Sequence, residues 1–174
     1  LSHPDYYLRR NEQASVSSNA ATSAKTIKKE MERQGLEAVT YLAIAPGTEF
    51  LTKDAPLLTA LEVEEVPVNQ AFIIDGNKDA RANSREGLAG LKNDISITDF
   101  DDNIFDPRTR EKILPLIDPK NIVVGGTYGG TIMNASGSPH EGPPLEGVQN
   151  NVNALAGLVG VNGHLIAVID CTPD

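Results

Sequence analysis

Cysteine, tryptophan and basic residues are scarce in this chain of 174 residues. The single cysteine, Cys171, excludes an internal disulfide and a zinc site built from several cysteines. With no Trp, four Phe and four Tyr, a core must be built from Val, Ile, Leu and Ala. No apolar run approaches the roughly 20 residues of a membrane-spanning helix. The hydrophobic content of 40% nevertheless suffices for one core.

Negative charge dominates what is present. Fifteen basic residues against 24 acidic ones give a formal net charge of −9. Such a chain repels phosphate backbones and anionic lipid surfaces, so we expect no nucleic-acid partner and no membrane insertion. Fifteen Gly and eleven Pro indicate many turns, which suits a fold that contains a β-sheet.

The chain divides near residue 22. Residues 1–22 have little hydrophobic periodicity and are rich in Ser, Ala and Asn, which predicts a flexible N-terminal arm. Residues 23–174 are expected to form a single domain. It opens with a helix capped by Thr22 or Ser23 that ends at Gly35.

Several elements follow from short patterns. The apolar run from Val39 to Ala45, closed by Pro46 and Gly47, predicts a central strand. Asp54 and Asp106, each closely followed by Pro, predict helix starts. Further strands are expected at 70–74, 94–99 and 122–124, and residues 134–147 are expected to form a long loop.

The end of the chain has the clearest strand pattern. An Asn162-Gly163 turn precedes an aliphatic run that ends at Asp170, which predicts the second strand of a hairpin that completes the sheet. Helices therefore come early and strands late, with short connections. This order favours an α+β fold over a doubly wound α/β sheet.

No catalytic constellation is visible. Cys171 follows Asp170, whose charge disfavours a thiolate, so we interpret it as structural. His3, His140 and His164 lack the spacing of a metal site. The glycines of 125–130 lack the Lys-Ser/Thr ending of a phosphate loop. We expect no catalytic residue, no metal and no cofactor.

Acidic residues gather between 99 and 106. Asp99, Asp101, Asp102, Asn103 and Asp106 carry oxygen ligands of the kind that Ca²⁺ prefers. The spacing lacks the Gly and the terminal Glu of an EF-hand loop. We therefore predict a solvated acidic loop in which Asp106 caps the next helix.

Two separated segments resemble the fasciclin-like adhesion family. Residues 40–50 are similar to its first box, a strand that ends in Ala45-Pro46 and is followed by Phe50. Residues 162–170 are similar to its second box, Asn162-Gly163 followed by aliphatics and Asp170. The Tyr-His pair of the family is absent between them.

This resemblance implies a β-sheet wedge with a small helical bundle and a non-catalytic role in adhesion. A secreted or cell-surface location and a protein or cell-wall or matrix carbohydrate partner would follow. The sequon Asn134-Ala135-Ser136 makes Asn134 a candidate glycosylation site.

Two alternatives stay open. Residues 122–128 resemble the strand and glycine turn of isochorismatase-like α/β hydrolases, although 129–132 lack that family's cysteine nucleophile. The other alternative is a secreted interaction protein with a different ligand.

Overall fold

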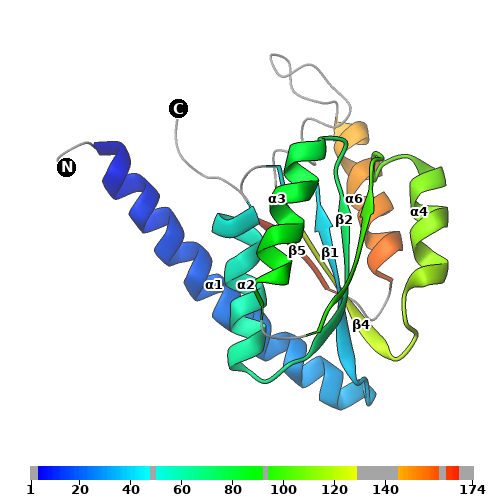
Figure 1. Cartoon of the computed structure of the whole chain (residues 1–174), viewed down its shortest axis with the longest axis horizontal. Helices are drawn as coiled ribbons and strands as arrows, with labels where there is room; N and C mark the ends of the chain where they lie inside the picture. Colours follow the sequence, from blue (N-terminus) through cyan, green and yellow to red (C-terminus); the bar gives the residue numbers. More distant parts are fainter. Residues whose placement is uncertain (1–3, 48–49, 92–93, 129–144, 161–163, 169–174) are drawn as a thin grey trace.

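A computed structural model of the chain describes residues 4–47, 50–91, 94–128, 145–160 and 164–168. Helices and strands alternate along it (Figure 1). The elements are α1 (Pro4–Gln34), β1 (Ala38–Ile44), α2 (Phe50–Val63), β2 (Val68–Ile74), α3 (Lys78–Ala89), β3 (Ser96–Phe100), α4 (Pro107–Ile113), the 3₁₀ turn η1 (Leu114–Leu116), β4 (Asn121–Tyr128), α6 (Leu145–Val159) and β5 (His164–Val168).

The five strands form one sheet in the order β3-β2-β1-β4-β5, and every neighbouring pair is parallel. The chain therefore moves outward from β1 to β3 and then returns to the other side of β1. Parallel neighbours require a crossover on one face of the sheet, and here helices make the crossovers. This is the doubly wound α/β arrangement.

Two apolar clusters cover the two faces of the sheet. On one face, Val39, Tyr41 and Ala43 of β1 pack with buried residues of α1, α2 and α3. On the other face, Leu42 and Ile44 pack with residues of α4 and α6. All seven residues of β1 are buried, because β1 is covered on both faces and paired on both edges. The core thus centres on β1.

Local sequence explains where two helices begin. The Asn77 side chain accepts hydrogen bonds from the backbone N–H groups of Asp79 and Ala80 and so caps α3. The Asp106 side chain accepts from the Arg108 N–H and caps α4, with Pro107 in its first turn. The predicted cap at Asp106 is confirmed. None of the described helices is long and apolar enough to cross a bilayer.

Some predictions are confirmed and others are wrong. Helices and a sheet do combine in the described chain, and strands occur at 38–44, 68–74 and 96–100 close to where they were expected. The broad prediction of helices combined with a β-sheet is thus confirmed, whereas the finer order, helices early and strands late, and the fasciclin-like wedge are wrong, since strands and helices alternate. The C-terminal hairpin is also wrong: β5 does lie at an edge of the sheet, but it pairs in parallel with β4 after the crossover helix α6.

Two helix starts differ from the expectation. α2 begins at Phe50, and Asp54 lies inside it as a buried side chain that binds Tyr41. α1 begins at Pro4 and runs through residue 22, where the sequence placed the boundary between arm and domain. Its N-terminal part extends beyond the sheet (Figure 1). The division of the chain at residue 22 stays a prediction.

Candidate functional site

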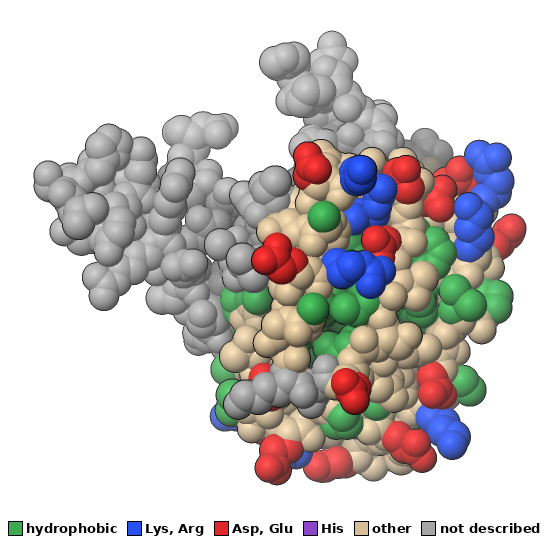
Figure 2. Space-filling model, in the orientation of Figure 1, with side chains coloured by type: hydrophobic (Ala, Val, Ile, Leu, Met, Phe, Trp, Pro, Cys, Tyr) green, Lys and Arg blue, Asp and Glu red, His purple; other side chains and the backbone are tan. Residues whose placement is uncertain are grey.

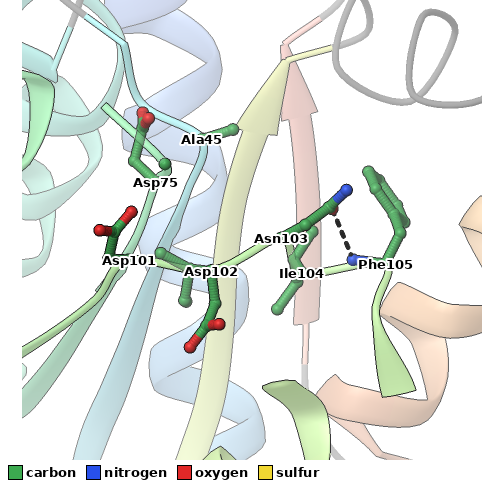
Figure 3. A pocket seen from close by; sticks show the side chains of 9 residues that line it. Ala45, Asp75, Asp101, Asp102, Asn103, Ile104 and Phe105 are labelled. Atoms are coloured by element: carbon green, nitrogen blue, oxygen red, sulfur yellow. Dashed lines mark hydrogen bonds between the residues drawn. The ribbon is translucent and has the colours of Figure 1, made fainter. Parts of the chain in front are cut away.

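A pocket lies at the carboxyl ends of three adjacent strands. Its cavity measures about 540 Å³ and adjoins the end of β1, the end of β2 and the loop after β3. In open parallel sheets, ligands bind outside the carboxyl ends of the strands, near the point where the strand order reverses. In this sheet the order reverses between β1 and β4, so the pocket lies beside that point, on the β1 side. The lining residues are Ala45, Ile74, Asp75, Gly76, Asp101, Asp102, Asn103, Ile104 and Phe105 (Figure 3).

Asp75, directly after β2, holds two neighbouring turns together. One carboxylate oxygen accepts from the Gly47 N–H at 3.0 Å, and the other accepts from the Asn77 N–H at 2.8 Å. Gly47 belongs to the turn after β1, and Asn77 is the N-cap of α3. The Asp75 carboxylate is half-buried between these turns. It is therefore fixed in place where it lines the pocket.

The turn after β1 has an unusual backbone. Ala45 has φ of +46° and Gly47 has φ of +59°, both in the left-handed region. Glycine enters that region without steric cost, whereas alanine does so with strain. The Ala45 N–H still donates to the Ile74 carbonyl at 2.8 Å, which keeps the turn against the end of β2. A methyl group therefore borders the pocket where nucleotide-binding folds have glycine.

The loop after β3 lines the pocket with both acidic and apolar side chains. Ile104 is buried and Phe105 is half-buried. The Phe105 N–H donates to the Asn103 side-chain oxygen at 3.0 Å, which fixes the amide orientation (Figure 3). Asp102 and Asp101 bring two further carboxylates to the rim. The pocket thus combines hydrogen-bonding groups with an apolar surface.

The acidic residues of this region have cationic partners. Asp101 lies 3.1 Å from an Arg81 nitrogen, Asp102 lies 3.2 Å from Lys112 Nζ, and Asp99 pairs with Arg85. Figure 2 shows acidic and basic side chains intermixed over the region of α3. Among the described residues, no group of three His, Cys, Asp or Glu side chains could hold a metal ion.

The residues singled out from sequence fall in different places. Ala45 lines the pocket, Pro46 is buried beside it, and Phe50 is buried at the start of α2. His164 is the first residue of β5. The residues that lie outside the described ranges are His3, Asn134, His140, Asn162, Gly163, Asp170 and Cys171. Glycosylation of Asn134 and a secreted location stay predictions.

Sequence reasoning missed Asp75 and Arg81. Neither residue belongs to a motif that the sequence analysis singles out. The available signal was a carboxylate placed directly after a buried apolar run, since such a residue lies at the ligand-binding edge of a parallel sheet.

No protein-family model matches the chain, and no curated protein matches it. Among solved structures, two similar proteins come from Burkholderia thailandensis. One is an uncharacterised protein with 24% identity, TM-score 0.42 and 64% of this chain covered. The other, of the same superfamily, is an inferred methyl transferase bound to S-adenosyl-homocysteine, with 23% identity, TM-score 0.43 and 67% covered.

A third similar structure is an S-adenosylmethionine-dependent methyltransferase from Clostridium acetobutylicum, with 11% identity, TM-score 0.46 and 83% of this chain covered. The chain spans 26% of the length of each Burkholderia protein and 48% of the Clostridium protein.

These findings correct the functional expectations. The all-parallel sheet does not form the wedge with a helical bundle which the fasciclin resemblance implied. The fasciclin identification is therefore wrong. The non-catalytic adhesion role that this resemblance implied is withdrawn with it, and so is the support that it gave to the expectation of a chain without enzymatic activity. Neither the hydrolase nor the secreted interaction protein gains support.

Proposed function

We propose that this chain binds the nucleoside part of S-adenosylmethionine, as the cofactor-binding domain of a methyltransferase. The observation that carries the proposal is Asp75, held at the end of β2 over a pocket of nucleoside size. In doubly wound folds an acidic residue at this place binds the ribose hydroxyls of the ligand.

Asp75 has the capacity for that role. A carboxylate has about four lone-pair positions, and the Gly47 and Asn77 N–H groups occupy one on each oxygen. The remaining positions can accept hydrogen bonds from two vicinal hydroxyl groups. Because the two backbone bonds already fix the carboxylate, a ribose binds without first ordering this side chain.

The loop after β3 suits the base. Ile104 and Phe105 offer apolar surface for the flat face of adenine, and Asn103 and Asp102 offer polar atoms for its edge. A pocket that combines apolar surface with a few fixed polar groups is typical of small-molecule sites.

The same pocket disfavours phosphate groups. Phosphate binding in this fold uses glycines whose exposed N–H groups approach the pyrophosphate. Here the turn after β1 reads Ala45-Pro46-Gly47, so one N–H is absent at Pro46 and the Gly47 N–H is engaged by Asp75. Three carboxylates line the cavity and repel a further negative charge. A phosphate-free, positively charged nucleoside fits this chemistry better than a dinucleotide.

When bound, S-adenosylmethionine supplies an electrophilic methyl group on its sulfonium. Asp75 would hold the ribose, and the loop after β3 would hold the adenine. The residues of the pocket thus bind and orient the cofactor.

Calorimetric titration with S-adenosylhomocysteine tests the proposal. We expect saturable binding by the wild-type chain and at least about tenfold weaker binding by Asp75→Asn, since one acceptor oxygen becomes a donor. NAD⁺ should bind more weakly than S-adenosylhomocysteine. Asp118→Asn is the matched control. The Asp118 carboxylate also accepts a hydrogen bond from the backbone N–H two residues later, but Asp118 lies just before β4, at the amino ends of the strands and away from the pocket. Wild-type protein that shows no saturable binding, or that prefers NAD⁺, would overturn the proposal.

A further inference from the structure

Arg81, on α3, reaches two of the loops that form the pocket. One of its guanidinium nitrogens donates to the Asp75 carbonyl at 2.8 Å and lies 3.1 Å from Asp101 Oδ1. The side chain of Arg81 is only 14% exposed, whereas that of Asp101 is 71% exposed. The bond from this largely buried guanidinium to the Asp75 carbonyl is charge-assisted and is less weakened by solvent and salt than a surface pair.

Together, Arg81 and Asp75 connect the segments that follow β1, β2 and β3 at the carboxyl ends of these strands. The Asp75 carboxylate binds the turn after β1 through Gly47 and the start of α3 through Asn77. Arg81 then binds the backbone of Asp75 and the side chain of Asp101, in the loop after β3. A backbone bond from the Asp75 N–H to the Phe100 carbonyl at 3.2 Å also joins the ends of β2 and β3. The Arg81 guanidinium, which does not itself line the cavity, adds the side-chain link from Asp75 to the loop beyond β3.

We infer that Arg81 is a positioning residue, which sets the separation between the Asp75 turn and the loop at 101–105. Its effect on ligand affinity rests on the proposed nucleoside site, but its effect on the loop does not. Arg81 also partly neutralises Asp101, so the loop stays close to Asp75 although both carry negative charge. Without this cation, repulsion between the carboxylates favours a more open arrangement.

Arg85 provides a matched comparison within the same helix. It lies one turn after Arg81 and also pairs with an aspartate of this region, Asp99 on β3. Its side chain is 47% exposed, and neither Arg85 nor Asp99 lines the pocket. Loss of Arg85 therefore removes a similar contact between α3 and β3. It leaves the contacts of Arg81 with the Asp75 carbonyl and with Asp101 in place.

Hydrogen exchange and calorimetry on the full chain test the inference with Arg81→Met and Arg85→Met. We expect Arg81→Met to accelerate amide exchange at 101–105 and to weaken S-adenosylhomocysteine binding by about tenfold. Arg85→Met should change both far less. Arg81→Lys keeps the positive charge without the planar guanidinium, so its exchange rates at 101–105 and its affinity should lie between those of the wild type and Arg81→Met. This variant replaces Arg81→Met in the test if Arg81→Met does not fold.

The two readouts separate the two proposals. If wild-type protein does not bind S-adenosylhomocysteine, the proposed function fails, and exchange at 101–105 still decides the role of Arg81. Equal exchange at 101–105 in the Arg81 and Arg85 variants would overturn the inference. So would unchanged affinity in Arg81→Met when the wild type binds.

Discussion

At the residue scale, a buried polar pair shows how closely the centre of the sheet is packed. The Tyr41 hydroxyl donates to Asp54 Oδ1 at 2.5 Å, and the two residues are 1% and 4% exposed. Tyr41 lies on β1 and Asp54 on α2, so the bond ties the first crossover helix to the central strand. The pair occupies the space over Gly126 of β4, which explains why that position has no side chain.

Gly126→Ala should therefore destabilise the protein. An added Cβ would lie 2.7 Å from Asp54 Oδ1 and closer still to the Tyr41 hydroxyl. Overpacking of this kind costs about 1–3 kcal/mol in the free energy of unfolding. Urea denaturation monitored by circular dichroism measures the change.

Gly157→Ala is the control for that experiment. Gly157 lies within α6, and a Cβ there would meet nothing within 4 Å. Replacing an open helical glycine by alanine should stabilise the protein by about 0.5–1 kcal/mol. Equal effects of the two substitutions would show that the Tyr41–Asp54 pair does not fill the space over Gly126.

At the element scale, the start of α4 carries a pH-sensitive cap. The Arg108 side chain donates a hydrogen bond to Asp106, the Arg108 N–H donates another, and together they hold the pKa of the Asp106 carboxyl below its ordinary value. A lowered pKa means that the charged form favours the folded state. The contribution of the cap to stability is thus present above the ordinary aspartate pKa and is lost as pH falls through the lowered one.

An NMR titration of the Asp106 carboxyl carbon tests this cap. We expect a midpoint below that of an ordinary aspartate. Arg108→Gln should move the pKa of Asp106 upward, although only part of the way, because the backbone N–H of residue 108 remains. Arg110→Gln is the control, since the Arg110 guanidinium instead donates to the Ile104 carbonyl. An Asp106 midpoint that is the same in the wild type and in Arg108→Gln would contradict the role given to the Arg108 side chain.

Elements with strong local signals could be predicted from the sequence. The apolar run at Val39 marks β1 because a strand buried on both faces needs no alternation. Asp106 before Pro107 marks α4 because both residues suit the free N–H groups of a first helical turn. In these cases the physical cause of the element lies within a few residues.

Features that depend on distant partners could not be predicted. Asp54 resembles an N-cap locally, yet its actual partner is Tyr41, thirteen residues away on another element. The Asn162-Gly163 pair resembles a hairpin turn, but β5 takes its place beside β4 through a crossover. Ala45 belongs to a segment that resembles a family box, and Asp101 to a segment predicted as a solvated acidic loop, so nothing local connects them. Only the strand order shows that they share one site.

At the scale of the whole molecule, the sheet predicts where stability is concentrated. β1 is hydrogen-bonded on both edges, to β2 and to β4, and all its side chains are buried. β3 lies at an edge of the sheet, and its residues are half-buried or exposed. Amides of β1 can therefore open only when the layers on both faces separate, whereas amides of β3 can open locally.

Native-state hydrogen exchange, resolved by residue, measures this difference. The slowest amides of β1 should exchange with an opening free energy equal to the global free energy of unfolding from urea denaturation. Amides of β3 should exchange faster, with opening free energies that depend little on low urea concentrations, because local opening exposes little new surface. β2, paired on both edges and buried over most of its length, is the internal comparison and should follow β1. If β3 were protected as strongly as β1, the sheet would have to be covered beyond β3, and the strand order would not set the distribution of stability.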